Sequence, residues 1–100
     1  MPKIGSKRSI KIPKGICDDL WRTNIHFGFS GRKIFVSKDD SFDKDQYLYL
    51  GYSYLDCQGR VSLPVDAISI LDCNFGDVVL VYKSKEGIFI ENPKFMHRQD

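Results

Sequence analysis

The sequence lacks the features of several large classes of protein. No stretch approaches the ~18 consecutive apolar residues that a transmembrane helix requires, and the N-terminus has no signal-peptide core. The three cysteines, Cys17, Cys57 and Cys73, form no C-x-x-C pair. Their odd number and spacing indicate neither a disulfide framework nor a zinc site. We therefore expect a cytoplasmic protein with reduced thiols and no membrane contact.

Motifs for catalysis are also missing. The eight glycines are scattered and form no G-x-x-x-x-G-K-[ST] phosphate loop. His26 alternates within a predicted strand and His97 lies near the C-terminus, and neither has a sequence context that indicates a catalytic partner. Asp18 and Asp19 are adjacent, so on a helix their carboxylates point apart rather than toward one cation. The cysteines have no signalled base that would activate a nucleophile. We expect no enzymatic activity, no cofactor and no metal.

What the chain does have is an uneven distribution of charge. The formal net charge is +2 at pH 7, yet the first fourteen residues contain five basic side chains and no acidic one, whereas residues 39–45 contain four Asp and one Lys. A basic arm is typical of a nucleic-acid contact or of a solvated terminus, and the acidic stretch favours a plain loop. The basic side chains of the arm are Lys3, Lys7, Arg8, Lys11 and Lys14.

The composition favours a small, mainly β fold. One hundred residues suffice for one domain, or for two very small units that share a core. Apolar residues make up 42% and aromatic residues 13% of the chain, which is enough for folding without disulfides. Alternating patterns and turn residues predict short helices at 14–21 and 65–72 and strands at 9–12, 25–29, 33–37, 46–56, 60–63, 77–84 and 87–92.

Three glycines mark turns or irregularities. Gly59 is expected to take a positive φ in the tight turn before the strand that begins at Arg60, and that strand is expected to pair back on the 46–56 strand as the second arm of a hairpin. Gly76 is expected to do the same after the second helix, where Asp77 can cap the turn. Gly51 interrupts the aromatic strand at 46–56 and predicts a β-bulge.

The strand at 46–56 carries several tyrosines, for which two interpretations differ. Aromatic side chains on a strand can stack on nucleic-acid bases. A strand this aromatic can also pack at the junction of the two halves of the chain, and we favour packing. The tyrosines are Tyr47, Tyr49, Tyr52 and Tyr54.

The chain contains an internal repeat of strand, proline, helix and hairpin. The segment SIKIP, which ends at Pro13, matches RVSLP, which ends at Pro64, and each proline precedes a predicted helix. The hairpin strands IHFGF and KIFV match VVLVY and GIFI. The offset is about 51 residues at the front and 54 at the back. Because a two-turn helix has no stability alone and each unit is too small to bury its own faces, we expect the two units to interlock.

The second half contains a conspicuous set of residues at fixed spacing, namely Gly59, Arg60, Val61, Leu63, Pro64, Leu71, Gly76 and Asp77. Over about 45 residues this pattern resembles the AbrB/SpoVT/MazE family of swapped-hairpin DNA-binding domains. That family has a strand followed by x-G-R-h-x-h-P, a short helix ending in Leu, a Gly-Asp pair and a final hairpin. The first half resembles the same unit more faintly, without the Gly-Asp pair. Cys73 stands where the family has an aliphatic residue, which implies a core position.

This resemblance implies the fold and the organisation of the chain. We expect a mainly β structure with two short helices, in which two swapped-hairpin-like units form an intrachain pseudo-dimer barrel. The first, divergent unit spans residues 1–38, an acidic linker spans 39–45, and the second unit spans 46–93. Residues 94–100 are expected to form a flexible tail. A pseudo-dimeric monomer and a homodimer both remain open.

The resemblance also implies a function, DNA binding in transcriptional regulation. The family's Gly-Arg arginine corresponds to Arg60, and its counterpart in the first unit is Ser9, with Arg8 beside it. The short helices lack the basic residues that AbrB-like members carry. The alternative is an antitoxin-like or regulatory protein-interaction module that keeps the fold but has lost DNA binding. The predicted contacts with double-stranded DNA are Lys3, Lys7, Arg8, Lys11, Lys14 and Arg60.

Overall fold

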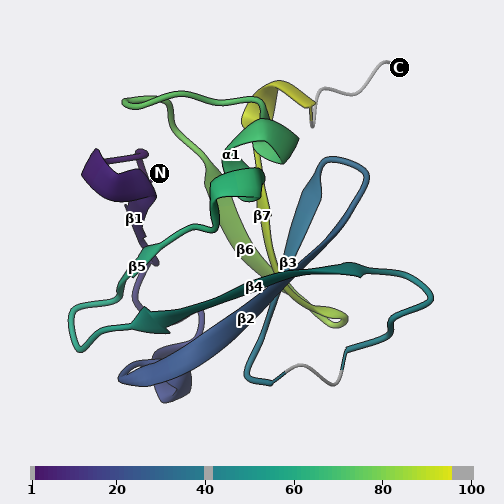
Figure 1. The fold of residues 1–100 in the computed structure, drawn as a ribbon. Coiled ribbons are helices and arrows are strands. Elements are labelled where there is room, and N and C mark those ends of the chain that lie inside the picture. The colour runs from purple at the N-terminus through teal and green to yellow at the C-terminus, as the bar shows by residue number, and fades with distance from the viewer. Residues whose placement is uncertain (1, 40–41, 96–100) are drawn as a thin grey trace.

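The fold consists of two open β-sheets, with one α-helix among the described residues (Figure 1). The computed structural model describes residues 2–39 and 42–95. The larger sheet has the strand order β4-β2-β3-β7-β6, and the smaller one pairs β1 with β5. The elements are η1 (Ser6–Arg8), β1 (Ser9–Lys11), η2 (Asp18–Leu20), β2 (Thr23–Ser30), β3 (Lys33–Ser37), β4 (Leu48–Leu55), β5 (Arg60–Ser62), α1 (Val65–Leu71), β6 (Leu80–Ser84), β7 (Gly87–Glu91) and η3 (Pro93–Phe95).

The mainly β prediction is confirmed, whereas the closed barrel is wrong. In the larger sheet β4 and β6 form opposite edges, and β1 and β5 pair with each other rather than completing a ring. The tail predicted at 94–100 begins inside η3, and residues 96–100 lie outside the described residues. His97 falls in that segment.

The α-helix at the predicted 65–72 position is confirmed. It starts after Pro64, buries Ala67 and Leu71, and ends where Asp72 adopts a left-handed conformation with φ 54°. The Asn92 side chain closes this end, because its Nδ2 donates hydrogen bonds to the carbonyl oxygens of Leu71 at 2.9 Å and Asp72 at 3.2 Å. Those carbonyls have no partner within the helix.

The helix predicted at 14–21 is wrong, because that segment forms only the single 3-10 turn η2. Gly15 takes φ 97°, and its N–H donates to Oδ1 of Asp18 at 2.8 Å. Cys17 also has a non-helical backbone, with φ −151° and ψ 49°. An Asp that bonds the backbone three residues earlier offers a turn that competes with the helix. The apolar spacing of Ile16 and Leu20 therefore places both side chains against the core without an α-helix.

The predicted pairing of the 46–56 strand with the 60–63 strand is also wrong. A hydrogen bond does join the two strands at the turn, where the Asp56 N–H donates to the Arg60 carbonyl oxygen at 3.0 Å. Beyond that bond β5 pairs with β1. The predicted features of β4 and of the turns are confirmed. A bulge lies next to Gly51, because Gly51 and Tyr49 face the consecutive residues Phe27 and Gly28 of β2. Gly59 and Gly76 have φ of 81° and 90°.

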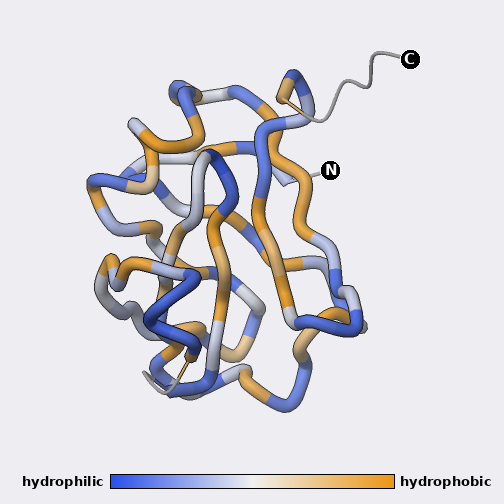
Figure 2. Tube along the Cα trace, turned by 90° about the vertical axis from the view of Figure 1, so that its right-hand side faces the viewer, coloured by the Kyte–Doolittle hydropathy of each residue, from blue (hydrophilic) through white to orange (hydrophobic). Residues whose placement is uncertain are grey.

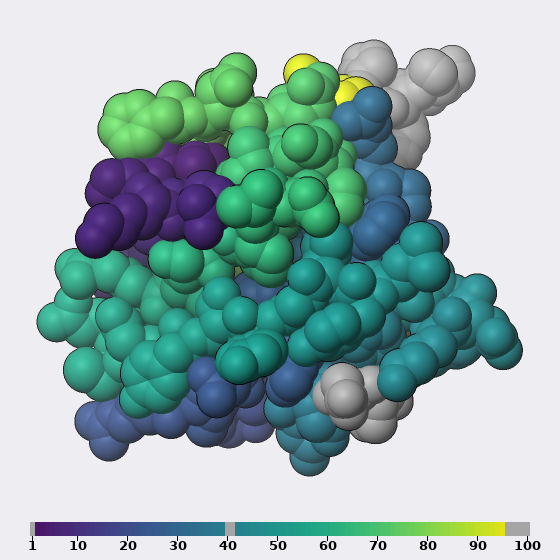
Figure 3. All heavy atoms as spheres, viewed as in Figure 1, coloured from purple at the N-terminus to yellow at the C-terminus, as the bar shows by residue number. Residues whose placement is uncertain are grey.

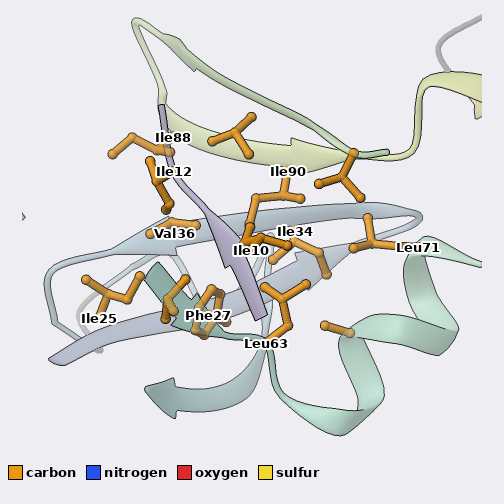
Figure 4. Close-up of a cluster of buried hydrophobic side chains, with 14 of the residues drawn as sticks. Ile10, Ile12, Ile25, Phe27, Ile34, Val36, Leu63, Leu71, Ile88 and Ile90 are labelled. Carbon is orange, nitrogen blue, oxygen red and sulfur yellow. The ribbon is translucent and has the colours of Figure 1, made fainter. Parts of the chain in front are cut away.

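The core lies between the inner face of the larger sheet and a cover formed by β1, β5 and α1 (Figure 4). The strands supply every second residue to it, and the hydropathy colouring shows these apolar segments inside polar turns (Figure 2). Cys73 is buried in this core, as the resemblance implies, and so is Cys17. Fully buried members include Ile12, Ile25, Phe27, Ile34, Leu55, Leu63, Leu71 and Ile90.

The acidic stretch at 39–45 contributes to the fold, although it was expected to be a plain loop. Asp40 and Ser41 lie outside the described residues, but Phe42 is only 9% exposed. Its ring lies edge-on to Phe35 and stacks on Tyr49. Gly28 makes room for it, since a β-carbon there would approach the Phe42 ring to 2.9 Å. Phe42 therefore packs on the outer face of the larger sheet.

The strand registers repeat the internal symmetry of the sequence. In the β1–β5 pair, Ile10 faces Val61, and the repeat treats these two residues as equivalent. In the β3–β7 pair, Phe35 faces Phe89, which are equivalent as well. When each residue is replaced by its equivalent in the other half, the two residue pairs on either side of such a central pair exchange places. These are Ser9–Ser62 with Lys11–Arg60, and Ile34–Ile90 with Val36–Ile88.

Backbone hydrogen bonds outside these registers follow the same rule. The Leu63 N–H donates to the Arg8 carbonyl oxygen at 2.9 Å, and its counterpart runs from the Ile12 N–H to the Gly59 carbonyl oxygen at 2.8 Å. The Gly5 N–H donates to Ser9, as the Asp56 N–H donates to Arg60. The two halves of the chain therefore make equivalent backbone hydrogen bonds around the β1–β5 pair.

Candidate nucleic-acid interface

The β1–β5 pair brings two of the predicted DNA-binding residues together. Lys11 and Arg60 are cross-strand partners. Both are exposed, because the alternating residues Ile10 and Val61 point into the core. Two surface depressions lie beside this strand pair, and Arg60 lines both of them.

One depression, here called the cationic depression, has a volume of about 160 Å³. Lys3, Lys11 and Arg60 supply three positive charges to it, and no carboxylate occurs among the described residues that line it. Its floor includes Gly5, which carries no side chain. It is lined by Lys3, Gly5, Ser9, Ile10, Lys11 and Arg60. The space-filling view places the N-terminal residues beside the β4–β5 segment on one face of the molecule (Figure 3).

The other depression, here called the tyrosine depression, has a volume of about 200 Å³. Each residue that lines it is equivalent, under the 51-residue offset of the repeat, to one residue that lines the cationic depression. The residue types differ, because an exposed tyrosine and a carboxylate stand where the first has Lys3 and Gly5. It is lined by Ser9, Tyr54, Asp56, Arg60, Val61 and Ser62.

The Asp56 carboxylate is fixed by the turn that precedes β5. Its Oδ1 accepts hydrogen bonds from the backbone N–H groups of Arg60 at 2.9 Å and Gln58 at 2.8 Å. These bonds, with the charges of Arg60 and Lys11, hold the pKa of Asp56 below its usual range. The tyrosine depression therefore contains an ionised carboxylate at neutral pH.

The other predicted contacts are placed differently. Arg8 takes part in the fold, because its Nε donates to the Leu63 carbonyl oxygen at 2.9 Å. Lys7 is exposed on η1 with φ 59°. Lys14 is exposed in the turn after Pro13, and it lines neither depression.

Tyr54 and Asp56 are the residues of this surface that sequence reasoning missed. Tyr54 was expected to pack at the junction of the halves, and that expectation is wrong, because it is 55% exposed. Tyr52 is exposed as well, whereas Tyr47 stacks on Phe35 with ring centroids 4.6 Å apart. The sequence does contain a signal for the exposure of Tyr54, because the repeat makes position 54 equivalent to Lys3, a predicted surface contact.

The lone strand histidine has a structural setting. His26 Nδ1 lies 2.9 Å from the hydroxyl of Tyr49, and its ring also contacts Tyr52. Within residues 2–39 and 42–95, no group of three or more His, Cys, Asp or Glu side chains is arranged to hold a metal ion. The same residues contain no helix long and apolar enough to cross a membrane.

Comparison with protein-family models finds no match to this chain, and comparisons with curated proteins and with solved structures find no significant match.

Proposed function

We propose that this chain is an intrachain pseudo-dimer of two swapped-hairpin-like units that binds double-stranded DNA as a transcriptional regulator, in the manner of the AbrB-like family that its second half resembles. The pseudo-dimer is supported by the registers of β1–β5 and β3–β7, which are both centred on equivalent residues. In that arrangement each unit supplies the strands that the other needs to cover its core.

The observation that carries DNA binding is the cationic depression. Lys3, Lys11 and Arg60 converge there from the N-terminal arm, β1 and β5, with Lys7 exposed nearby in sequence. A net charge of only +2 does not oppose this function, because association depends on the local field rather than on the total charge. Phosphate contacts would position the protein, and base contacts would then specify the site.

A protein-interaction module is the second candidate function. It is favoured by the edge strand β4, whose exposed side chains include Leu48 at 63% and Tyr52 at 63%. An edge strand with apolar side chains is a suitable surface for another chain. On this hypothesis the cationic depression has no ligand.

The deciding experiment measures binding of the full chain to a random duplex pool as a function of salt, by fluorescence anisotropy. If three phosphates are neutralised, log K falls with log salt at a slope of about −2.7, from about 0.9 per phosphate. The matched variant pair is K3A/K11A, which removes two charges from the depression, and K83A/K85A, which removes two exposed charges on β6 and its turn. Only the first should flatten the slope. No binding by the folded protein at low salt would favour the interaction module.

A further inference from the structure

We propose that the two depressions are not equivalent toward DNA: backbone phosphate binds in the cationic depression and not in the tyrosine depression, so the protein docks on duplex DNA in a single orientation. This inference rests on the proposed DNA binding. One half of the symmetric fold then contacts the phosphates, and the DNA site lacks twofold symmetry.

The backbone provides two geometrically equivalent positions. The lining residues of the depressions correspond one to one under the 51-residue offset, and the hydrogen bonds that shape their rims also occur in pairs. A protein with two identical depressions of this kind would present the same surface after a half-turn. Such proteins bind sites whose two halves mirror the twofold symmetry of the protein.

The side chains break that equivalence. Lys3 corresponds to Tyr54, and Lys11 corresponds to Ser62, so two cations of one depression are replaced by uncharged groups in the other.

The glycine of the cationic depression is replaced as well, since Gly5 corresponds to Asp56. The remaining exchanges are neutral, because Ser9 and Arg60 line both depressions and Ile10 corresponds to the equally apolar Val61.

The two linings therefore differ in charge. The cationic depression has three positive charges in its lining, whereas the tyrosine depression has one arginine beside the ionised carboxylate of Asp56. A phosphate in the second position would lose two attractive charges and face a repulsive one. Like charges brought together at an interface disfavour that orientation. The expected DNA site is therefore not an inverted repeat.

The first test compares matched neutral changes at equivalent positions. K3A/K11A should flatten the salt slope by about 1.8, at about 0.9 per phosphate, whereas Y54A/S62A should leave it unchanged. The variant Y54K/S62K, which places the two lysines of the cationic depression at the equivalent positions of the tyrosine depression and leaves Asp56 in place, should steepen the slope. Thermal unfolding of each variant checks that the fold is kept.

The second test reads orientation directly. Cys57 is the exposed cysteine beside Asp56, while Cys17 and Cys73 are buried, so an iron chelate that cleaves DNA can be attached at Cys57. The offset maps position 57 onto Ser6, so C57S/S6C carries the same reagent on the opposite side. On a duplex selected from a random pool, we expect each tether to cleave one side of the site, and the two tethers to cleave opposite sides.

The outcomes separate the two proposals. If the wild-type protein binds no duplex, DNA binding itself is wrong. If it binds but K3A/K11A and Y54A/S62A change the slope equally, or if both tethers cleave both sides or cleave uniformly, DNA binding stands and the single orientation is wrong. Symmetric cleavage by Y54K/S62K alone, with one-sided cleavage by the wild type, would support the inference further.

Discussion

Trp21 lies so close to the backbone of Gly59 that a β-carbon at position 59 would be 2.7 Å from Cζ2 of the indole. Gly59 also takes φ 81°, a conformation that residues with side chains rarely adopt. The turn into β5 therefore needs glycine for two separate reasons. One reason comes from the first half of the chain, which supplies the tryptophan.

We predict that Gly59→Ala destabilises the protein more than Gly76→Ala. Both glycines have φ near 90°, so each substitution carries the left-handed backbone cost of about 1–2 kcal/mol. A β-carbon at position 76 has nothing within 4 Å, whereas one at position 59 must displace Trp21. Urea unfolding of the two variants measures the difference. Equal losses of stability would mean that the indole moves aside without cost.

A second prediction concerns the end of α1. Asn92 is 7% exposed, and its amide serves the last carbonyl groups of the helix. Asn92→Ala should lower the free energy of unfolding by about 1–3 kcal/mol, because it leaves the buried Leu71 carbonyl oxygen without a donor. Asn74→Ala, at an exposed asparagine, should change it by less than about 0.5 kcal/mol. A similar small effect at both positions would show that water replaces the Asn92 amide.

Several parts of this fold follow from the sequence for identifiable reasons. The hairpin around Gly31 and the helix after Pro64 depend on local signals, namely turn glycines, alternation and a proline at a helix start. The wrong helix prediction at 14–21 also has a local cause, because Gly15 and the Asp18 carboxylate stabilise a turn that apolar spacing alone does not reveal.

The pairing of β5 was harder to predict because it joins residues far apart in the chain. Adjacent strands favoured a local hairpin, yet the repeat contained the correct partner, since equivalent strands meet across a twofold arrangement. The candidate site also depends on residues that lie far apart in the chain. Charge selected Lys3 and Lys11 together with Lys14, and the resemblance added Arg60, but only the fold separates the residues that share a depression from those that do not.

A third prediction concerns thiol reactivity. Cys57 is exposed, whereas Cys17 is 2% and Cys73 is 3% exposed, and burial raises the pKa of both buried thiols. Because the thiolate is the reactive form, one thiol per chain should react quickly with an alkylating reagent at neutral pH. Mass spectrometry of peptides should locate the label at Cys57, with the others labelled only after unfolding. Rapid labelling of Cys17 would indicate that the segment before η2 opens readily.

A fourth prediction is the alkaline limit of stability. Burial, followed by the charges of Asp19 and Asp18, raises the pKa of Cys17 from 9.0 to about 11. The folded state therefore holds this proton more tightly than the unfolded state does, and the resulting stability is present below pH 9 and lost as pH rises toward 11. The free energy of unfolding should fall over this range, and Cys17→Ala should make that fall shallower. An unchanged slope would assign the alkaline transition to other groups, such as Tyr82, whose pKa is raised to about 12.

The last prediction separates two arginines that the sequence placed in one group. Arg60 is exposed and lines both depressions, whereas Arg8 gives its Nε to the Leu63 carbonyl oxygen. Arg60→Ala should leave the melting temperature unchanged and flatten the salt slope of DNA binding by about 0.9. Arg8→Lys keeps its charge but loses the Nε donor, so it should cost about 0.5–1.5 kcal/mol of stability and leave the slope unchanged. The reverse pattern, with DNA binding sensitive to Arg8→Lys and insensitive to Arg60→Ala, would move the interface away from the β1–β5 pair to η1.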